Sequence, residues 1–341
     1  MDLPVQLVTE APADPVIFVD GAAPPGSRVT LELSHWPGNA TPPELRHDLS
    51  TGCALAFAKL PAERRRALAA DARSIANNHY DTDGTLALFA VRHPDLALQH
   101  EETLLDAARA GDFFAWPTDE ALCLDATIHR LSSHPASPLA HEHADWSALP
   151  SVERWNLCTA RLLEELPALL AGDLAPWRAL WEPVLERARS DRDRLQQGSR
   201  SEDAARSWTA WHLTGAGPLP GRHALFGGTH ADRVSVLQTV EGGTECRLAI
   251  STRSWFDLVS TPRRPRPDLA ALAERLNSLE GSSAEDTFAW RAQPSGSPSP
   301  ELWFGESALE LFAEHNEASR PSRLAPDVLA REIARTLDGT S

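Results

Sequence analysis

Residues 75–88, which read I-A-N-N-H-Y-D-T-D-G-T-L-A-L, constrain the fold more than any other part of this chain. A short apolar segment, a group of polar side chains and an apolar helical pattern follow one another, which is typical of a strand that leads into a helix. His79, Asp81 and Asp83 alternate, so an extended backbone would point all three side chains to one side. Such a trio can bind a divalent cation. The alternative is a turn with a helix N-cap, because Asn, Asp and Gly are common turn residues.

Apolar strand-like segments and helical patterns alternate through the first third of the chain. The strands are expected at residues 16–21 and 28–33 and just before His79, and the helices at residues 43–60, 62–72, 85–91 and 95–110, the last one stopped by Gly111. Residues 122–128 fit either a strand or a helix, and the proline-rich residues 1–15 read as a loose tail. This alternation predicts an α/β domain with a mainly parallel sheet and flanking helices.

The pattern changes twice after the first third. A linker rich in Ser, His and Pro over residues 132–150 precedes long helical patterns over residues 152–195. The chain then reads as a β-hairpin, a helix, a loop and two closing helical patterns, the first three over residues 234–252, 268–279 and 281–300. We therefore predict an N-terminal α/β domain over residues 1–131, a linker and helical connector over residues 132–206, and a smaller C-terminal α+β domain over residues 207–341.

Charge and composition limit the partners of the chain. A net charge of −16 argues against an extended nucleic-acid surface, since such binding neutralises phosphates with basic side chains. Lys59 is the only lysine among 32 basic residues, which argues against Schiff-base chemistry and a P-loop. No apolar run is long enough for a membrane span and no basic leader is seen, so we expect no membrane association and a cytoplasmic location. The four cysteines are scattered and read as buried, reduced thiols.

A metal site is the first functional hypothesis that these residues support. His79, Asp81 and Asp83 would provide three ligands, and Asp112, which follows a helical pattern in A-G-D-F-F, would provide a fourth. Carboxylate oxygens suit hard cations and an imidazole shifts the preference towards Mn²⁺, so Mn²⁺ or Mg²⁺ is expected. Asn78 and its neighbouring amide would orient these ligands.

The segment H-Y-D-T-D-G, residues 79–84, resembles the first motif of the DHH-type phosphoesterases, H-x-D-x-D-G at a strand exit that leads into a helix. The resemblance implies that His79, Asp81 and Asp83 bind catalytic Mn²⁺ or Mg²⁺. A-G-D-F with Asp112 is similar to a later motif of that family. S-T-R-S, residues 251–254, is similar to the S-x-R-S segment of its second domain, which implies that Arg253 contacts phosphate. The chain contains no D-H-H triplet.

Two further segments bear on the site. S-H-W-P-G-N, residues 34–39, together with N-N-H-Y-D-T-D-G, is similar to an uncharacterised bacterial family over most of the chain. The loop after a strand is also where ligands bind in open α/β sheets, so His35 and Asn39 either line a substrate site or only shape the loop. With Asn78 and Arg253, they are the candidate substrate contacts.

A rival metal site lies at His141, His143 and Asp145. The H-x-H-x-D spacing is similar to the start of the metallo-β-lactamase-type zinc site, although Trp146 stands where that site has a further histidine. Solvated loop histidines are the other interpretation of this segment.

These observations favour a metal-dependent, phosphoesterase-like hydrolase that acts on a small phosphorylated or anionic molecule. A metal-activated water would attack phosphorus, and Arg253 or an arginine near it would neutralise the leaving phosphate. Two alternatives stay open. One is a non-catalytic binding or scaffold protein with a degenerate DHH-like site, which the missing D-H-H triplet favours. The other is an enzyme of specialised metabolism that uses the same frame for different chemistry.

Overall fold

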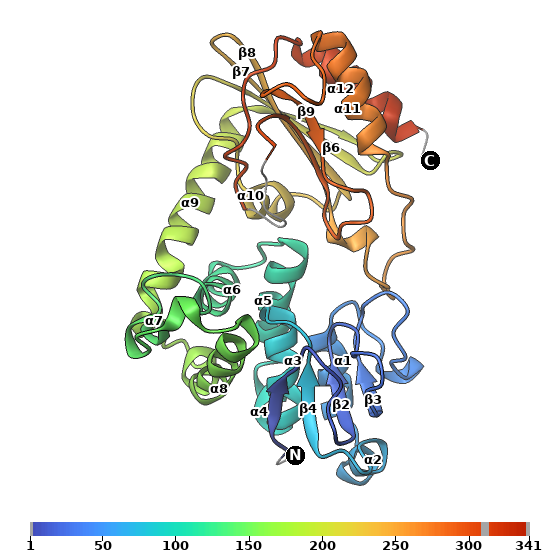
Figure 1. Ribbon diagram of the computed structural model, residues 1–341, viewed down its shortest axis with the longest axis vertical. Coiled ribbons are helices and arrows are strands. Elements are labelled where there is room, and N and C mark those ends of the chain that lie inside the picture. The colour runs from blue at the N-terminus through green and yellow to red at the C-terminus, as the bar shows by residue number, and fades with distance from the viewer. Residues whose placement is uncertain (1–2, 308–313, 339–341) are drawn as a thin grey trace. The chain divides into compact units, whose positions relative to one another are not determined.

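The computed structural model describes residues 3–307 and 314–338, which form two compact units. The first unit comprises Met1–Glu186 and Phe256–Pro262, and the second comprises Arg187–Trp255 and Arg263–Ser341. The predicted α/β class is confirmed, because each unit combines a β-sheet with helices (Figure 1). No helix in the described part of the chain has the length and apolar character that crossing a bilayer requires.

The sheet of the first unit is parallel throughout, as predicted. Its strands are β1 (Val5–Leu7), β2 (Val16–Val19), β3 (Val29–Leu33) and β4 (Ser74–Asn77), in the spatial order β1-β4-β2-β3. Every residue of the two central strands, β2 and β4, is buried, as expected for a parallel sheet that is covered on both faces. The prediction of a loose N-terminal tail is wrong for β1, which pairs with β4.

Three helices of the first unit contact this sheet. Helices α1 and α3 pack against each other and against the strands, and α8 contacts β1 (Figure 1). In chain order the helices are η1 (Pro43–Leu45), α1 (Ser50–Ala58), α2 (Ala62–Leu68), α3 (Thr82–Arg92), α4 (Pro94–Gln99), α5 (Glu101–Phe113), α6 (Asp119–Leu131), α7 (Pro138–Glu142), η2 (Trp146–Ala148), α8 (Ser151–Leu170), η3 (Ala175–Trp177) and α9 (Arg178–Gln197). The residues of α9 from Arg187 onwards belong to the second unit.

Several predicted boundaries are wrong. The helix expected over residues 43–60 is two elements, η1 and α1, and the one over residues 95–110 is divided between α4 and α5. Gly111 does not stop α5, which continues to Phe113. A Cβ at Gly111 would lie 2.9 Å from Asp125 Oδ1 and 3.0 Å from Thr82 Cβ, so this glycine permits close helix packing. Residues 122–128, left open between strand and helix, belong to α6.

The second unit is built on a mixed sheet in the order β5-β6-β7-β8-β10-β9. Its core joins the apolar faces of β7, β8 and β10 to those of α11 and α12 (Figure 1). Its elements are β5 (Ser199–Asp203), β6 (Trp208–Thr214), α10 (Arg222–Gly227), β7 (Arg233–Val240), β8 (Gly243–Ile250), η4 (Thr252–Ser254), α11 (Leu269–Glu280), β9 (Ala289–Ala292), β10 (Glu301–Gly305) and α12 (Pro326–Asp338).

Sequence-based expectations for the second unit are largely met. The predicted hairpin is β7 and β8, which pair antiparallel around a glycine turn. The expected loop over residues 281–300 contains β9, which the sequence analysis missed. One of the two closing helical patterns is α12, and residues 308–313, between β10 and α12, lie outside the described residues. The four cysteines are buried free thiols, as predicted.

Candidate metal centre

The carboxyl ends of β2, β3 and β4 meet at one edge of the parallel sheet, and each supplies polar side chains there. Asp20 directly follows β2, His35 lies two residues beyond β3, and His79 lies two residues beyond β4. This is the edge where ligands bind in open α/β sheets. Asp20 is not among the ligands expected from the sequence, although its place directly after a buried strand was a usable signal.

The backbone beyond β2 turns sharply into this edge. Asp20 and Gly21 have φ values of 51° and 66°, in the left-handed region. A Cβ at Gly21 would lie 2.1 Å from Asn78 Oδ1 and 3.1 Å from His79 Nδ1. Glycine is therefore required where the chain after β2 passes the polar segment after β4.

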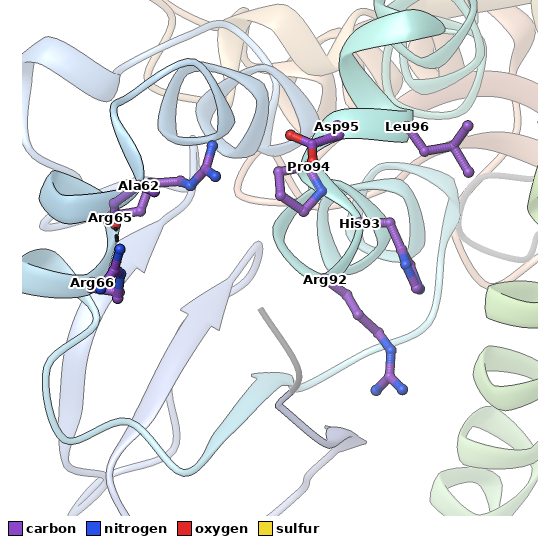
Figure 2. Close-up of a pocket in the computed structure, with 8 residues that line it drawn as sticks. All are labelled: Ala62, Arg65, Arg66, Arg92, His93, Pro94, Asp95 and Leu96. Carbon is purple, nitrogen blue, oxygen red and sulfur yellow. Dashed lines mark hydrogen bonds between the residues drawn. The ribbon is translucent and has the colours of Figure 1, made fainter.

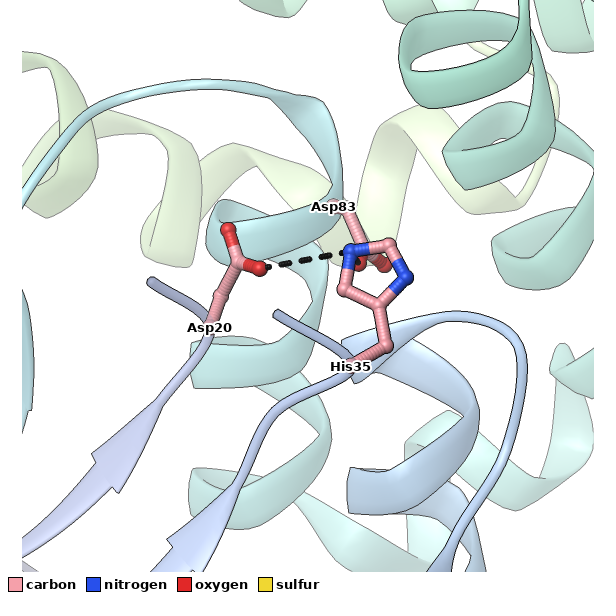
Figure 3. Close-up of side chains that lie close together, drawn as sticks. All are labelled: Asp20, His35 and Asp83. Carbon is pink, nitrogen blue, oxygen red and sulfur yellow. Dashed lines mark ion pairs between the residues drawn. The ribbon is translucent and has the colours of Figure 1, made fainter. Parts of the chain in front are cut away.

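A first group of potential cation ligands comprises Asp20, His35 and Asp83, all at most 1% exposed (Figure 3). His35 Nε2 lies 3.7 Å from Asp20 Oδ1 and 3.6 Å from Asp83 Oδ2. Asp112 on α5 adds a further carboxylate, with its Oδ2 atom 3.1 Å from the same nitrogen. The structure therefore places His35, which was expected to contact substrate, among the potential ligands, and Asp112 beside it.

The surroundings of His35 set its tautomer. Its Nδ1 atom lies 2.6 Å from the carbonyl oxygen of Asp48, which can only accept, so Nδ1 must carry a proton. In the neutral ring, Nε2 then presents its lone pair to the carboxylates. This carbonyl contact is the orienting interaction commonly found behind metal-binding histidines.

Residues 256–262, a short segment of the first unit that lies far from His35 along the sequence, hold the His35 ring in place. Phe256 stacks on the imidazole with ring centroids 3.8 Å apart. The Asp48 carboxylate accepts hydrogen bonds from the amides of Val259 and Ser260, at 2.7 Å and 2.9 Å. The segment thus fixes both the face of the ring and the residue whose carbonyl sets its tautomer.

The second group comprises Asp20, His79 and Asp81. His79 Nε2 lies 3.0 Å from Asp20 Oδ2 and 2.9 Å from Asp81 Oδ2. Asn78 donates its amide to the carbonyl of Ala22 at 2.8 Å, which turns its Oδ1 towards His79 Nδ1 at 2.9 Å. The imidazole therefore donates through Nδ1 and presents Nε2 to the two carboxylates. This group is more open than the first, since His79 is 24% exposed and Asp81 33% exposed.

Asp83 reaches the site from a helix, whereas the sequence predicted an extended backbone there. Helix α3 begins at Thr82, so the backbone is not extended through Asp83 and the three alternating side chains do not form one set. Instead, the Asp83 carboxylate accepts hydrogen bonds from the amides of Ser50 and Thr51 at 2.7 Å and 2.8 Å, at the start of α1. Asp81 caps α3 by accepting from Gly84 N at 2.8 Å, so the expected N-cap exists alongside the cluster.

Burial and charge shift the proton affinities of the cluster. Burial lowers the pKa of His35, but the hydrogen bond and charge of Asp112 and the charges of Asp83 and Asp20 outweigh burial and raise this pKa to about 9. Burial and the Asp20 charge likewise raise the pKa of Asp83 to about 6. Burial opposes ionisation of Asp20, yet His79 and His35 lower its pKa to about 2. Positive charge therefore stabilises this cluster, whether protons or a cation supply it.

Asp20 joins the two groups. Its Oδ1 atom faces His35 and also accepts from Ser50 Oγ at 2.8 Å, while its Oδ2 atom faces His79. Among residues 3–307 and 314–338, the groups of side chains arranged to hold a cation are the two that share Asp20. The segment with His141, His143 and Asp145 is not among them. His141 lies in α7, which ends at Glu142, so the segment does not alternate as a strand would.

The other candidate substrate residues have separate places. Asn39 shapes its own loop, because its side chain donates to the carbonyl of Trp36 at 2.8 Å and accepts from the amide of Thr41 at 3.2 Å. Asn78 supports His79, as described above. Arg253 belongs to the second unit, on η4.

The comparisons with known proteins place the chain in a family. A family model described as a family of unknown function, DUF6687, matches residues 3–341. A comparison with curated proteins found no match. The expectation of an uncharacterised family is confirmed, and the match carries no activity with it. Because the match covers nearly the whole chain, this protein belongs to the family of unknown function DUF6687.

Proposed function

We propose that this protein is a metal-dependent, phosphoesterase-like hydrolase, which binds Mn²⁺ or Mg²⁺ at the Asp20 cluster and acts on a small phosphorylated or anionic molecule. The observation that carries the proposal is the position of Asp20 between two histidines whose Nε2 atoms both face carboxylates. Two carbonyl-type acceptors, from Asp48 and Asn78, set both rings in the tautomer that a cation requires.

The donor set suits a pair of hard cations that share Asp20. One cation would be held by Asp20, His35 and Asp83 with Asp112 beside it, and the other by Asp20, His79 and Asp81. Carboxylates dominate both sets, which favours Mg²⁺ or Mn²⁺ over softer metals. Bound cations of this kind lower the pKa of water and polarise a phosphoryl oxygen.

The difference in exposure between the two groups supports distinct roles. The His35 group is almost fully buried, so its side chains can contribute charge and position but leave little room for a substrate. His79 and Asp81 are partly exposed, and a substrate anion can approach the cluster only where side chains reach solvent. We therefore place the substrate on the His79 side.

The proposal is tested first by metal binding. Purified protein should contain stoichiometric Mn²⁺ or Mg²⁺ or take it up after treatment with a chelator, and Mn²⁺ should raise its melting temperature. Asp20→Asn and Asp81→Asn should each lower the affinity for the metal about 100-fold or more, because each removes a ligand rather than a supporting contact. Asp145→Asn, which alters an exposed carboxylate outside the cluster, is the control and should bind metal normally.

Activity is tested with a panel of phosphomonoesters and phosphodiesters in the presence of Mn²⁺. Hydrolysis that requires the metal and is lost in Asp81→Asn supports the proposed enzyme. Metal binding without hydrolysis of any of these esters would instead support an enzyme with other chemistry on the same frame. If the protein binds no metal and the two variants behave as the unmodified chain, the cluster is a structural one, as a scaffold protein would have.

A further inference from the structure

A separate pocket of about 540 Å³ lies in the first unit, away from the Asp20 cluster. Figure 2 shows its two sides, with residues of α2 facing the junction of α3 and α4. It is lined by Ala62, Arg65, Arg66, Arg92, His93, Pro94, Asp95 and Leu96. The pocket shares no residue with the metal centre. Asp83 lies at the start of α3, whereas Arg92, the last residue of the same helix, lines the pocket. About 13 Å of helix therefore separates the two residues.

The lining of this pocket is basic although the chain as a whole carries a net charge of −16. Three guanidinium groups stand against the single carboxylate of Asp95. Arg65 and Arg66 form no ion pair with any carboxylate in the described part of the chain: the Arg65 Nη1 atom donates to the carbonyl of Ala58, and the Arg66 Nε atom to that of Ala62 at 3.3 Å. Their charge therefore remains available to a ligand.

The backbone contacts also hold these arginines in position. Arg92 donates from Nη1 to the carbonyl of Leu3 at 2.9 Å, so each of the three guanidinium groups is anchored by at least one neutral acceptor. An anchored guanidinium loses less side-chain entropy when it binds an anion, and its planar fork matches the oxygens of a phosphate. Burial and the neighbouring Arg92 lower the pKa of His93, so at neutral pH this ring is an uncharged hydrogen-bonding group in the pocket.

The size of the pocket indicates more than a bare ion. Its volume lies within the range of small-molecule sites, about 300–1,000 Å³. Pro94, Leu96 and Ala62 add apolar surface beside the arginines. We infer that this pocket is a second binding site, which takes the phosphate group of a small phosphomonoester through Arg65, Arg66 and Arg92. The inference is independent of the metal-dependent activity proposed above.

The inference is tested by calorimetric titration of chelator-treated protein, at constant ionic strength, with three probes: glycerol phosphate, inorganic phosphate and glycerol. Glycerol phosphate should bind and glycerol should not. Arg65→Gln and Arg92→Gln should each lower its affinity about tenfold or more, the cost of losing one hydrogen bond to a charged group. Arg64→Gln is the matched control, because Arg64 lies on the same helix, pairs with Glu44 at 3.7 Å and does not line the pocket.

The titration with inorganic phosphate shows whether the pocket prefers a phosphorylated small molecule or free phosphate. Tighter binding of glycerol phosphate supports a phosphorylated small molecule as the ligand, whereas equal or tighter binding of inorganic phosphate contradicts that identity. Asp81→Asn should leave the titration unchanged. Absence of binding, an equal loss in Arg64→Gln, or a loss in Asp81→Asn would overturn the inference, and none of these results would bear on metal binding at the Asp20 cluster.

Discussion

His35 and His79 reach the cluster from different strands but in the same chemical state. Each donates from Nδ1 to a fixed oxygen, and each faces Asp20 through Nε2. In the metal-free protein, the surrounding carboxylates raise the pKa of both rings despite burial, to about 9 for His35. A proton therefore occupies the position on each Nε2 atom that a cation would take.

This competition predicts how metal binding depends on pH. A folded-state pKa of His35 near 9, above its ordinary 6.5, stabilises the metal-free fold below pH 6.5, and that contribution is lost as the pH rises through about 9. Cation binding requires the same proton to leave. The increase in melting temperature caused by Mg²⁺ should therefore grow from pH 6.5 to 9, as thermal unfolding with and without Mg²⁺ would measure. His141→Gln, an exposed histidine, should keep this trend, and an increase that is constant or shrinks with pH would contradict it.

At the scale of elements, the cluster depends on how closely α3 approaches β2 and β4. Gly84 lies in the first turn of α3 and is buried. A Cβ at this position would lie 2.1 Å from Asn77 Nδ2 and 3.0 Å from Asp20 Oδ2. Helix propensity by itself would favour alanine over glycine by about 1 kcal/mol. Glycine is nevertheless required at position 84, because there is no space for a Cβ atom.

Gly84→Ala should therefore destabilise the protein, by about 1–3 kcal/mol in urea unfolding, the usual cost of forcing an extra group into a packed interior. It should also weaken Mn²⁺ binding, because the new methyl group displaces Asn77 or Asp20. Gly296→Ala provides the comparison, since a Cβ at Gly296 meets no atom within 4 Å. A Gly84→Ala variant that is as stable as Gly296→Ala and binds Mn²⁺ normally would show that α3 can move away without cost.

At the scale of the whole molecule, each of the two units buries a group of charged side chains of its own. In the second unit, Glu301 is buried between Arg222 and Arg247, and all three side chains are 0% exposed. Arg247 donates to Glu301 from Nε at 3.1 Å and from Nη2 at 2.6 Å. Taking one partner away from such a buried group leaves uncompensated charge in the interior.

Glu301→Gln should therefore cost about 3–5 kcal/mol of unfolding free energy, measured by chemical denaturation, because two guanidinium groups lose their buried counter-ion. The folded variant should bind Mn²⁺ with unchanged affinity, since the Asp20 cluster belongs to the first unit. Glu285→Gln, an exposed carboxylate of the second unit, should change neither quantity. Reduced Mn²⁺ affinity in folded Glu301→Gln would mean that the two units are energetically coupled.

Much of the local structure could be predicted because its causes lie within a few residues. The buried runs at β2 and β4, the exit of β4 into a helix and the β7–β8 hairpin follow from apolar periodicity and glycine turns. Helix ends were less predictable. Gly111 has the sequence appearance of a helix stop, yet its function is to let α5 approach Asp125 and Thr82, which are distant along the chain.

The α/β class, the strand exit with His79 and Asp81, and the acidic character that favours cations could be inferred from the residues alone. That Asp20 and His35 join this group, and that Asp83 enters it from the first turn of a helix, follows from the folded chain. The reason is physical. Alternation and helix periodicity are local properties of the backbone, whereas the meeting of three strand ends depends on the order β1-β4-β2-β3, which long-range packing selects.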